Sequence, residues 1–201
     1  HPVAVEGGLR FTRIAAGAAH TCALTPQGEA YCWGRNDFGQ LGIGSTGGTG
    51  RPARVLGGGT FTELAAGGFH TCALSRAGAV LCWGRDADGQ LRGAAPTERC
   101  GGLACRTRPA PAGLAGARSV SAGFSASCAL AERFQGCWGR DDFGQLGVGR
   151  VAAEGPRRDP PPIGARVMRA IAGIISAPHR LLWRVRSALE HTADRIQRPE
   201  P

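Results

Sequence analysis

The sequence contains no lysine, so all 24 of its basic residues are arginine. Aromatic residues make up only 6% of the chain, and no apolar run approaches the length needed to span a bilayer. The absence of lysine excludes a phosphate-binding loop of the GxxxxGK[ST] type, and the chain also has no GxSxG elbow and no HExxH pair. These absences favour a protein that is not an enzyme and that needs no cofactor.

Glycine is what the sequence has in excess, with 33 glycines and 13 prolines among 201 residues. This composition is typical of a turn-rich, mostly β protein. The formal net charge of +9 can favour nucleic acid or anionic membranes as partners. The alternative is a compositional bias toward arginine, glycine, alanine and proline. This alternative argues against nucleic acid as the partner.

An internal repeat organises the first three quarters of the chain. A shift of 50 residues places 11–41 on 61–91, and more than half of those positions are then identical. A third copy follows at 120–146 after an insertion around 98–109. Self-similarity at this period indicates a propeller or a solenoid. The copies lie near 11–60, 61–116 and 117–150.

Each copy is predicted to contain a hairpin that places two cysteines opposite each other. In the first copy, a three-residue loop at 26–28 sets Cys22 opposite Cys32 and puts Gly28 where this loop needs a left-handed residue. The second copy repeats the arrangement with Cys72 and Cys82. In the third copy only eight residues separate Cys128 from Cys137, so its hairpin is predicted to be shorter or distorted.

The segments HTCAL and CWGRNDFGQLGIG, followed by HTCAL and CWGRDADGQL, resemble the repeat of the regulator of chromosome condensation family. The resemblance covers roughly residues 10–150 and implies blades of a β-propeller, which in this family normally has seven. The sequence departs from the pattern at Arg92, which replaces a glycine, and at Ala126, which replaces a histidine. Three copies are also fewer than a closed propeller needs.

The fold class expected is therefore all-β: an incomplete β-propeller of about three blades, followed by a C-terminal α-helical tail. We expect either a fragment of a larger propeller or an arc that further repeats or other chains close. Open strand edges at both ends of such an arc would otherwise promote aggregation.

The eight cysteines can all pair locally, since Cys100 and Cys105 lie together within the insertion. Closing a loop of about ten residues would stabilise each blade by on the order of 2–3 kcal/mol. Two alternatives remain: eight small buried thiols in a reducing compartment, or a zinc site formed by His20, Cys22 and Cys32. Zinc is disfavoured because no fourth ligand recurs. The expected absence of a metal rests on that ligand count.

The other recurring residues are interpreted as parts of the scaffold. The histidines are expected to form hydrogen bonds within their own blades, the tryptophans to pack in the core, and the acids beside them to form turns and pair with arginine. GIGSTG at 42–47 matches a dinucleotide fingerprint by chance, because no helix can follow it. The recurring positions are His20, His70, Trp33, Trp83, Trp138, Gly39, Gly89, Gly144, Gln40, Gln90, Gln145, Leu41, Leu91 and Leu146.

The end of the chain differs in composition from the repeats. Residues 151–165 are predicted to form a proline-rich linker, and residues 166–198 a basic amphipathic helical tail. Such a tail can lie on an anionic membrane or dock on a partner. The alternatives are a helix that covers the open edge of the propeller and a partly disordered end.

These observations predict a non-enzymatic scaffold whose blade loops, at 45–59 and 92–116, bind another protein. The paired cysteines and the missing lysine favour a bacterial protein that is secreted or faces the cell envelope. The alternatives are a cytoplasmic or nuclear exchange factor for a small GTPase and a chromatin-associated propeller. An enzyme is the third reading.

Overall fold

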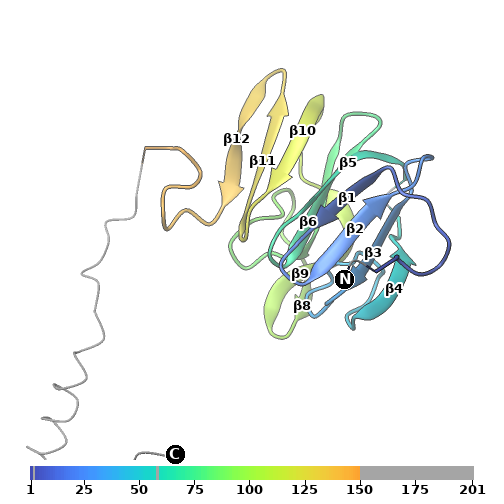
Figure 1. Ribbon diagram of the computed structural model, residues 1–201. Coiled ribbons are helices and arrows are strands. Elements are labelled where there is room, and N and C mark those ends of the chain that lie inside the picture. Colours follow the sequence, from blue (N-terminus) through green and yellow to red (C-terminus); the bar gives the residue numbers. More distant parts are fainter. Residues whose placement is uncertain (2, 58, 150–201) are drawn as a thin grey trace, which may run out of the picture. The chain divides into compact units, whose positions relative to one another are not determined.

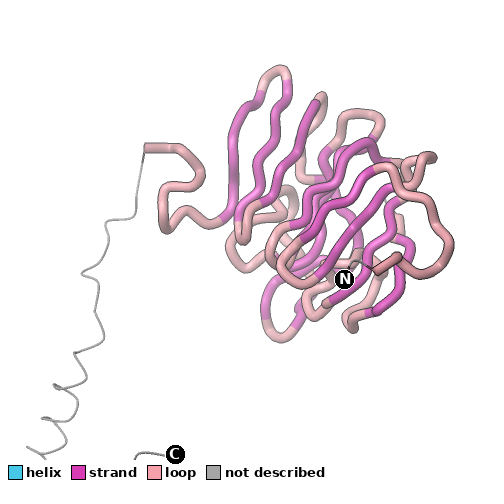
Figure 2. Tube along the Cα trace, viewed as in Figure 1, coloured by secondary structure: helices cyan, strands magenta, loops and turns pink. Residues whose placement is uncertain are grey.

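Each of the three sequence copies folds into its own antiparallel sheet in the computed structural model, which describes residues 1, 3–57 and 59–149 (Figure 1). Blade 1 has the strand order β1-β2-β3-β4: Arg13–Ala16, His20–Leu24, Ala30–Gly34 and Thr49–Arg54. Blade 2 has the order β5-β6-β7-β9-β8: Phe61–Ala66, His70–Ser75, Val80–Arg85, Leu103–Pro111 and Glu98–Cys100. Blade 3 contains β10, β11 and β12: Ala117–Ala122, Ala126–Ala131 and Phe134–Gly139. The predicted all-β class is confirmed, and the described residues contain no helix (Figure 2).

The blades follow one another in chain order. Strands β1 and β2 contact β5 of the next blade, and β5 and β6 contact β10 of the third. The buried apolar residues form two clusters, one between blades 1 and 2 around Trp83 and Leu41, the other between blades 2 and 3 around Trp138 and Leu91. The hydrophobic core therefore lies between blades, and each blade is stabilised by its neighbour.

The hairpin register agrees with the cysteine spacing. Cys22 lies opposite Cys32 and Cys72 opposite Cys82, and Gly28 at the third loop position has a φ of +87°. A side chain at Gly28 would also lie 2.7 Å from the Phe61 carbonyl oxygen, so the turn touches the next blade. In blade 3 a two-residue turn joins β11 to β12, which confirms the shorter hairpin and shows that its register is regular.

Two segments that the sequence suggests as loops contain strands. β4 lies within 45–59 and pairs with β3, and β9 lies within 92–116 and pairs with β7. These strands are hard to predict from the sequence because they contain Pro52, Pro109 and Pro111. Proline has no main-chain N–H and so cannot donate a hydrogen bond to a neighbouring strand. β4 tolerates its proline because it is an edge strand, with a partner on one side only.

The insertion in blade 2 forms a second hairpin. β8 pairs with β9 around Gly101 and Gly102, whose φ values of +58° and +82° suit a tight two-residue turn. The hairpin reaches blade 1, since Gly44 donates its main-chain N–H to the Thr107 carbonyl at 2.9 Å. Blade 2 is thereby wider than its neighbours and touches blade 1 at this edge also.

The predicted linker at 151–165 and the predicted helical tail at 166–198 lie outside the described residues. The described residues belong to one unit of the chain, His1–Ala153. Within the described part of the chain, no helix is long and apolar enough to cross a membrane.

Candidate functional site

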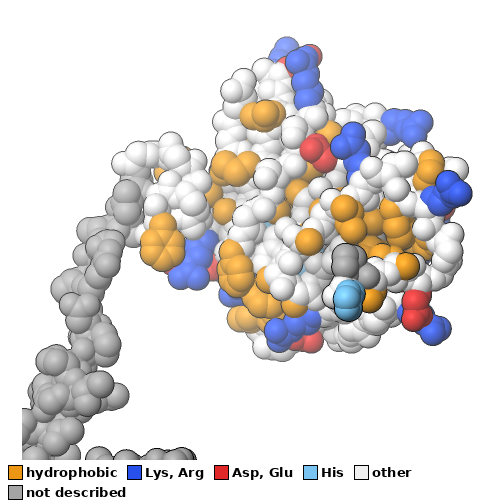
Figure 3. All heavy atoms as spheres, viewed as in Figure 1, with side chains coloured by type: hydrophobic (Ala, Val, Ile, Leu, Met, Phe, Trp, Pro, Cys, Tyr) orange, Lys and Arg blue, Asp and Glu red, His pale blue; other side chains and the backbone are white. Residues whose placement is uncertain are grey.

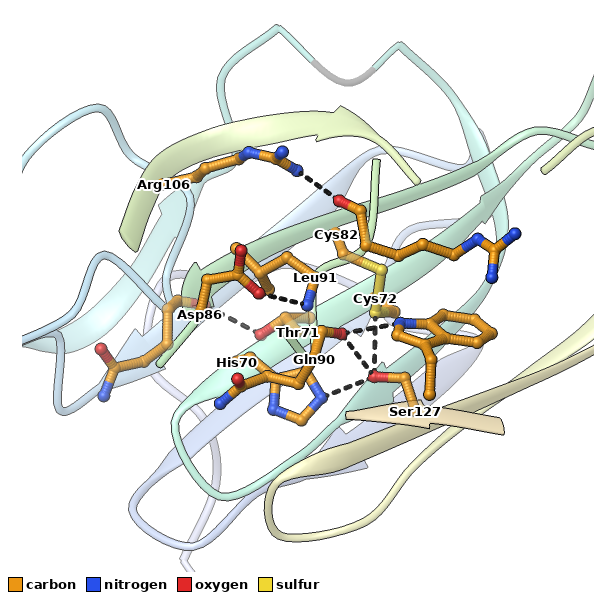
Figure 4. Close-up of a disulfide and its surroundings, with 12 residues drawn as sticks. His70, Thr71, Cys72, Cys82, Asp86, Gln90, Leu91, Arg106 and Ser127 are labelled. Carbon is orange, nitrogen blue, oxygen red and sulfur yellow. Dashed lines mark hydrogen bonds between the residues drawn. A yellow bond between two sulfur atoms is a disulfide. The ribbon is translucent and has the colours of Figure 1, made fainter. Parts of the chain in front are cut away.

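All eight cysteines are joined in the pairs that the sequence indicated. Cys22–Cys32, Cys72–Cys82 and Cys128–Cys137 link facing residues of a hairpin, and Cys100–Cys105 links β8 to β9. Figure 4 shows the pair of blade 2 among the residues that contact blade 3. The disulfides therefore fix the strands that carry the recurring polar residues.

A preformed turn holds the recurring glutamine in each blade. The glycine before it has a left-handed φ of +75° at Gly39, +74° at Gly89 and +74° at Gly144. Within each turn the glutamine side chain accepts a main-chain N–H from two residues earlier at 2.8–2.9 Å, as Gln40 does from Phe38. The leucine that follows donates its N–H to the side chain of Asn36, Asp86 or Asp141. These local bonds orient the glutamine main-chain oxygen.

At the contact between blades 1 and 2, the oriented oxygen accepts two hydrogen bonds. Thr71 Oγ1 donates to the Gln40 carbonyl oxygen at 2.9 Å, and Trp83 Nε1 donates to the same oxygen at 2.9 Å. His20 Nε2 lies 2.9 Å from Thr71 Oγ1. Four residues from two blades therefore form one buried hydrogen-bonded relay, which we call the interblade relay.

The same relay joins blades 2 and 3, with serine in place of threonine (Figure 4). Ser127 Oγ donates to the Gln90 carbonyl oxygen at 3.0 Å, and Trp138 Nε1 donates to it at 2.9 Å. His70 Nε2 lies 2.8 Å from Ser127 Oγ. The repeat thus places an interblade relay at both contacts between blades.

The relay fixes the protonation of the histidines. Because each hydroxyl gives its proton to a carbonyl, it must accept from the imidazole, so Nε2 carries the proton in His20 and His70. Burial lowers the pKa of both histidines from 6.5 to about 4, and the proximity of His20 adds to the effect at His70. Both side chains are therefore neutral at pH 7.

The histidine partners correct one expectation. Hydrogen bonds within a blade were expected, but both imidazoles reach hydroxyls of the following blade. Glycine makes room for the ring: a Cβ at Gly17 would lie 2.4 Å from His20 Cε1, and one at Gly67 2.2 Å from His70 Cε1. Thr71 and Ser127 were not recognised from the sequence. Their only signal is a hydroxyl residue that follows the histidine position in every copy.

The tryptophans differ by blade. Trp83 is fully buried and Trp138 is 7% exposed, whereas Trp33 is only half-buried and stacks on Phe11, with ring centroids 5.9 Å apart. Trp33 belongs to the first blade, which has no preceding glutamine turn among the described residues. Core packing thus describes Trp83 and Trp138 better than Trp33.

The free face of blade 3 differs from the two contacts. Gln40 and Gln90 are buried, whereas Gln145 is exposed and Leu146 is half-buried. Ala126 stands where the other blades carry histidine, so this blade supplies no imidazole. The recurring residues of blade 3 have the same local turn but no covering blade within the part of the chain described.

The charged residues form pairs at the turns, as expected. Arg35 pairs with Asp37, Arg140 with Asp142, and Arg85 with Asp88 at 3.5 Å. Burial raises the pKa of Asp86, while its acceptance of the Leu91 N–H acts in the opposite direction. Among residues 1, 3–57 and 59–149, no group of three His, Cys, Asp or Glu residues could hold a metal. The disulfide removes Cys22 and Cys32 as zinc ligands.

Comparison with known proteins agrees with this geometry. The family profile described as "Regulator of chromosome condensation (RCC1) repeat" matches residues 11–40 and 61–90, and a second profile of the same description matches 27–74. The ultraviolet-B receptor UVR8 of Arabidopsis thaliana is 47% identical over 45 residues, which are 22% of this chain and 10% of that protein. The E3 ubiquitin-protein ligase HERC2 of Homo sapiens is 47% identical over 47 residues, 22% of this chain and 1% of that protein.

Solved structures extend the likeness beyond single repeats. Prp20p from Saccharomyces cerevisiae, described for its binding to Gsp1p and histones, has a TM-score of 0.63 and 26% identity over 71% of this chain and 36% of its own. Yeast RCC1 (Prp20) bound to Kap60 has a TM-score of 0.58 and 26% identity over 67% of this chain and 33% of its own. The chain spans a tenth or less of the two curated relatives and about a third of these propellers. It is therefore a protein with repeats of the regulator of chromosome condensation (RCC1) family, folded as β-propeller blades.

Proposed function

We propose that the chain is a non-enzymatic scaffold that binds another protein through loops of its blades, in an extracellular or envelope compartment of a bacterium. The proposal is supported by the fact that the recurring polar residues are used for contacts between blades. The two histidines, the hydroxyls of Thr71 and Ser127 and the two buried tryptophans are engaged between blades, so they are not free to bind a substrate. Groups available to a partner lie on the loops, where binding residues are usually found.

The groove formed by the insertion carries this proposal. It has a volume of about 540 Å³ and is lined by residues 93–97 of the loop before β8, by Glu98 of β8 and by residues of β9. Prolines on both sides restrict its backbone. Arg106 is buried and donates to the main-chain oxygens of Arg92 and Ala94, whereas Arg108 is exposed. The groove belongs to the insertion, which only blade 2 has among the described blades.

The exposed guanidinium of Arg108 indicates the chemistry of the partner. Arginine recognises carboxylates through a planar pair of N–H donors. Glu98, at the other wall, accepts the Thr107 N–H at 2.9 Å, so one of its oxygens is already engaged. An extended acidic segment of a partner protein fits such a surface.

Selection of peptides tests this function directly. A random peptide library displayed on phage is panned on the oxidised full chain, and the affinity of enriched peptides is measured by fluorescence anisotropy. We expect acidic peptides that Arg108→Glu weakens by about tenfold or more, consistent with loss of a charge-assisted bond. The matched control is Arg133→Glu, an exposed arginine on blade 3. Equal binding by both variants, or no enriched peptide, would contradict the proposal.

The four disulfides support the proposed compartment. Glutathione and thioredoxin keep thiols reduced in the cytosol, so structural disulfides are typical of secreted and envelope proteins. Titration of thiols under denaturing, non-reducing conditions on protein from its natural source should find none of the eight cysteines reactive. Eight reactive thiols would place the protein in a reducing compartment.

Regulation of a small GTPase is a second candidate function. It is favoured by the similarity to the X-linked retinitis pigmentosa GTPase regulator homolog of Caenorhabditis elegans, which is 40% identical over 43 residues. The structural likeness to Prp20p, which is described for binding histones, favours a chromatin role in the same way. The chain would then accelerate release of labelled GDP from a purified small GTPase, and a chromatin role would require binding to histones. If the chain changes neither GDP release nor histone mobility at micromolar concentrations, this candidate is excluded.

A further inference from the structure

The free face of blade 3 presents the same acceptor as the faces that are covered inside the protein. Gln145 Oε1 accepts the Phe143 N–H at 2.9 Å, and the Leu146 N–H donates to Asp141 Oδ1 at 2.9 Å. The equivalent bonds in blades 1 and 2 orient the carbonyl oxygens of Gln40 and Gln90. The turn forms although no described blade covers it, so the Gln145 carbonyl oxygen is oriented in advance.

A cavity of about 610 Å³ lies on this face, lined by residues that include Phe124, Ala126, Cys128, Phe143 and Gln145. Phe124 is 62% exposed and Phe143 is 82% exposed. Figure 3 shows a hydrophobic side chain beside charged ones on the loop that follows β12. We call the cavity and the Gln145 carbonyl the socket. Its chemistry calls for two N–H or O–H donors set among apolar groups.

Blade 1, the first of the described blades, carries those donors. Thr21 occupies the position of Thr71 and Ser127, and Trp33 the position of Trp83 and Trp138. Thr21 is half-buried, and neither Thr21 Oγ1 nor Trp33 Nε1 donates to any described residue. We call Thr21 and Trp33 the plug. Within the described residues, blade 3 therefore presents an uncovered acceptor and blade 1 the matching pair of donors.

We propose that the socket of blade 3 binds the plug of blade 1 from a second copy of this chain. The Gln145 carbonyl oxygen accepts the Thr21 hydroxyl and the Trp33 indole N–H of that copy, which repeats the interblade relay between chains. A contact between two different faces is heterologous, so it either closes a ring or continues as a filament. Two copies supply six blades, which is within the range of closed propellers.

The contact between copies lacks two groups that the internal contacts use. Ala126 provides no imidazole for the Thr21 hydroxyl, although Gly123 keeps the glycine that gives the ring its room in blades 1 and 2. Ala19 stands where Phe69 packs against Phe38, with ring centroids 5.5 Å apart. The association is therefore weaker than the internal contacts, and restoring either residue should strengthen it.

Sedimentation velocity on the oxidised 201-residue chain, from about 1 to 200 μM, tests the proposal. We expect concentration-dependent association that Thr21→Val and Trp33→Phe each weaken by about three- to tenfold, the effect of one hydrogen bond. The matched control is Thr97→Val, an exposed threonine on the blade 2 loop, which should leave association unchanged.

Two variants that introduce a larger side chain are expected to strengthen the association. A gain in association cannot be explained by misfolding. Ala126→His and Ala19→Phe should each tighten the association by about threefold or more, because each adds a contact that the chain already makes internally. The gain from Ala126→His should disappear in the Thr21→Val background. A monomer at all concentrations, in the wild type and in the double variant with both additions, would overturn the proposal.

A photo-crosslinking amino acid at position 126 of the full chain identifies the occupant of the socket. The expected product is a dimer joined to the segment 19–33 of the second copy. Crosslinks to 166–198 of the same chain would assign the socket to the predicted tail and overturn the assignment to a second copy.

Discussion

The two contacts between blades share a polar centre and differ at their edges. Both place a hydroxyl and an indole N–H on a glutamine carbonyl, with a neutral histidine behind the hydroxyl. At the first edge, Phe38 packs against Phe69. At the second edge, Arg92 lies over Phe134 and Trp138, at 5.1 and 5.7 Å from the ring centroids. The centre is thus the constant part of the repeat, and the edges can vary.

The different edges of the two contacts are related to the replacement of the repeat glycine, Gly42 in blade 1, by Arg92 in blade 2. A Cβ at Gly42 would lie 2.8 Å from Trp83 Nε1, so blade 1 needs glycine there. Blade 2 carries Arg92 at the equivalent position, with an unfavourable φ of +54°. Its guanidinium covers Trp138, and this cation–π contact offsets part of the backbone strain.

Replacing the tryptophans with alanine should have the largest effect on stability. It should also distinguish the two tryptophans that are buried between blades from Trp33, which no described blade covers. Trp83→Ala should lower the free energy of unfolding by about 3–5 kcal/mol, because a buried indole and its hydrogen bond are lost. Trp138→Ala should follow closely, and Trp33→Ala should cost clearly less because that side chain is half-buried. Urea unfolding at pH 7.5 measures all three. A loss at Trp33 equal to that at Trp83 would contradict the difference between the faces.

Acidification should weaken both contacts through the histidines. The folded-state pKa of about 4 lies below the unfolded value of 6.5, so the unfolded chain binds more protons as the pH falls. The stability from neutral histidine is complete above pH 6.5 and is lost as the pH falls toward 4. Between pH 7.5 and 5 each histidine should account for about 2 kcal/mol.

The difference in pH dependence between the wild type and His70→Gln isolates this contribution, because other titrating groups are common to both. Urea midpoints at pH 7.5 and 5 measure it. Parallel pH profiles of the two proteins would show that His70 is not held neutral between the blades.

Removing one hydroxyl should have a smaller effect. Thr71→Val and Ser127→Ala should each cost about 1–2 kcal/mol, because an imidazole N–H then lies buried without its acceptor. Thr97→Val is the exposed control, and thermal unfolding is the measurement. The relay is common to both contacts, so the two losses should be similar. Losses that differ by more than about 1 kcal/mol would show that the relay does not stabilise the two contacts equally.

The smallest effect is expected at Arg92. Arg92→Ala keeps the unfavourable φ and removes the cation–π contact, which should cost about 0.5–1 kcal/mol at this exposed position. Arg92→Gly relieves the backbone strain and loses the same contact, so it should be closer to the wild type in thermal unfolding. If Arg92→Gly is the more destabilised of the two, the strain does not arise at this residue.

The fold could be predicted from the sequence because the spacing of residues within each repeat defines which strand residues pair. Cys22 and Cys32 stand symmetrically about their turn, and this alone defines the hairpin. The partner of His20 could not be found that way, because Thr71 lies 51 residues along the chain and its contact depends on how blades pack. The fourth strands were missed for a local reason, since Pro52, Pro109 and Pro111 interrupt the strand pattern that the backbone nevertheless adopts.

Hydrogen exchange of the tryptophan indole N–H groups, followed by NMR in dilute oxidised protein, tests the interblade relay most directly. Trp83 and Trp138 donate to buried carbonyl oxygens, so their indole protons should exchange slowly, while that of Trp33 should exchange fast. Substitution of each tryptophan by phenylalanine assigns the signals. Rapid exchange at Trp83 or Trp138, at the rate of Trp33, would contradict the relay as the feature that joins the blades.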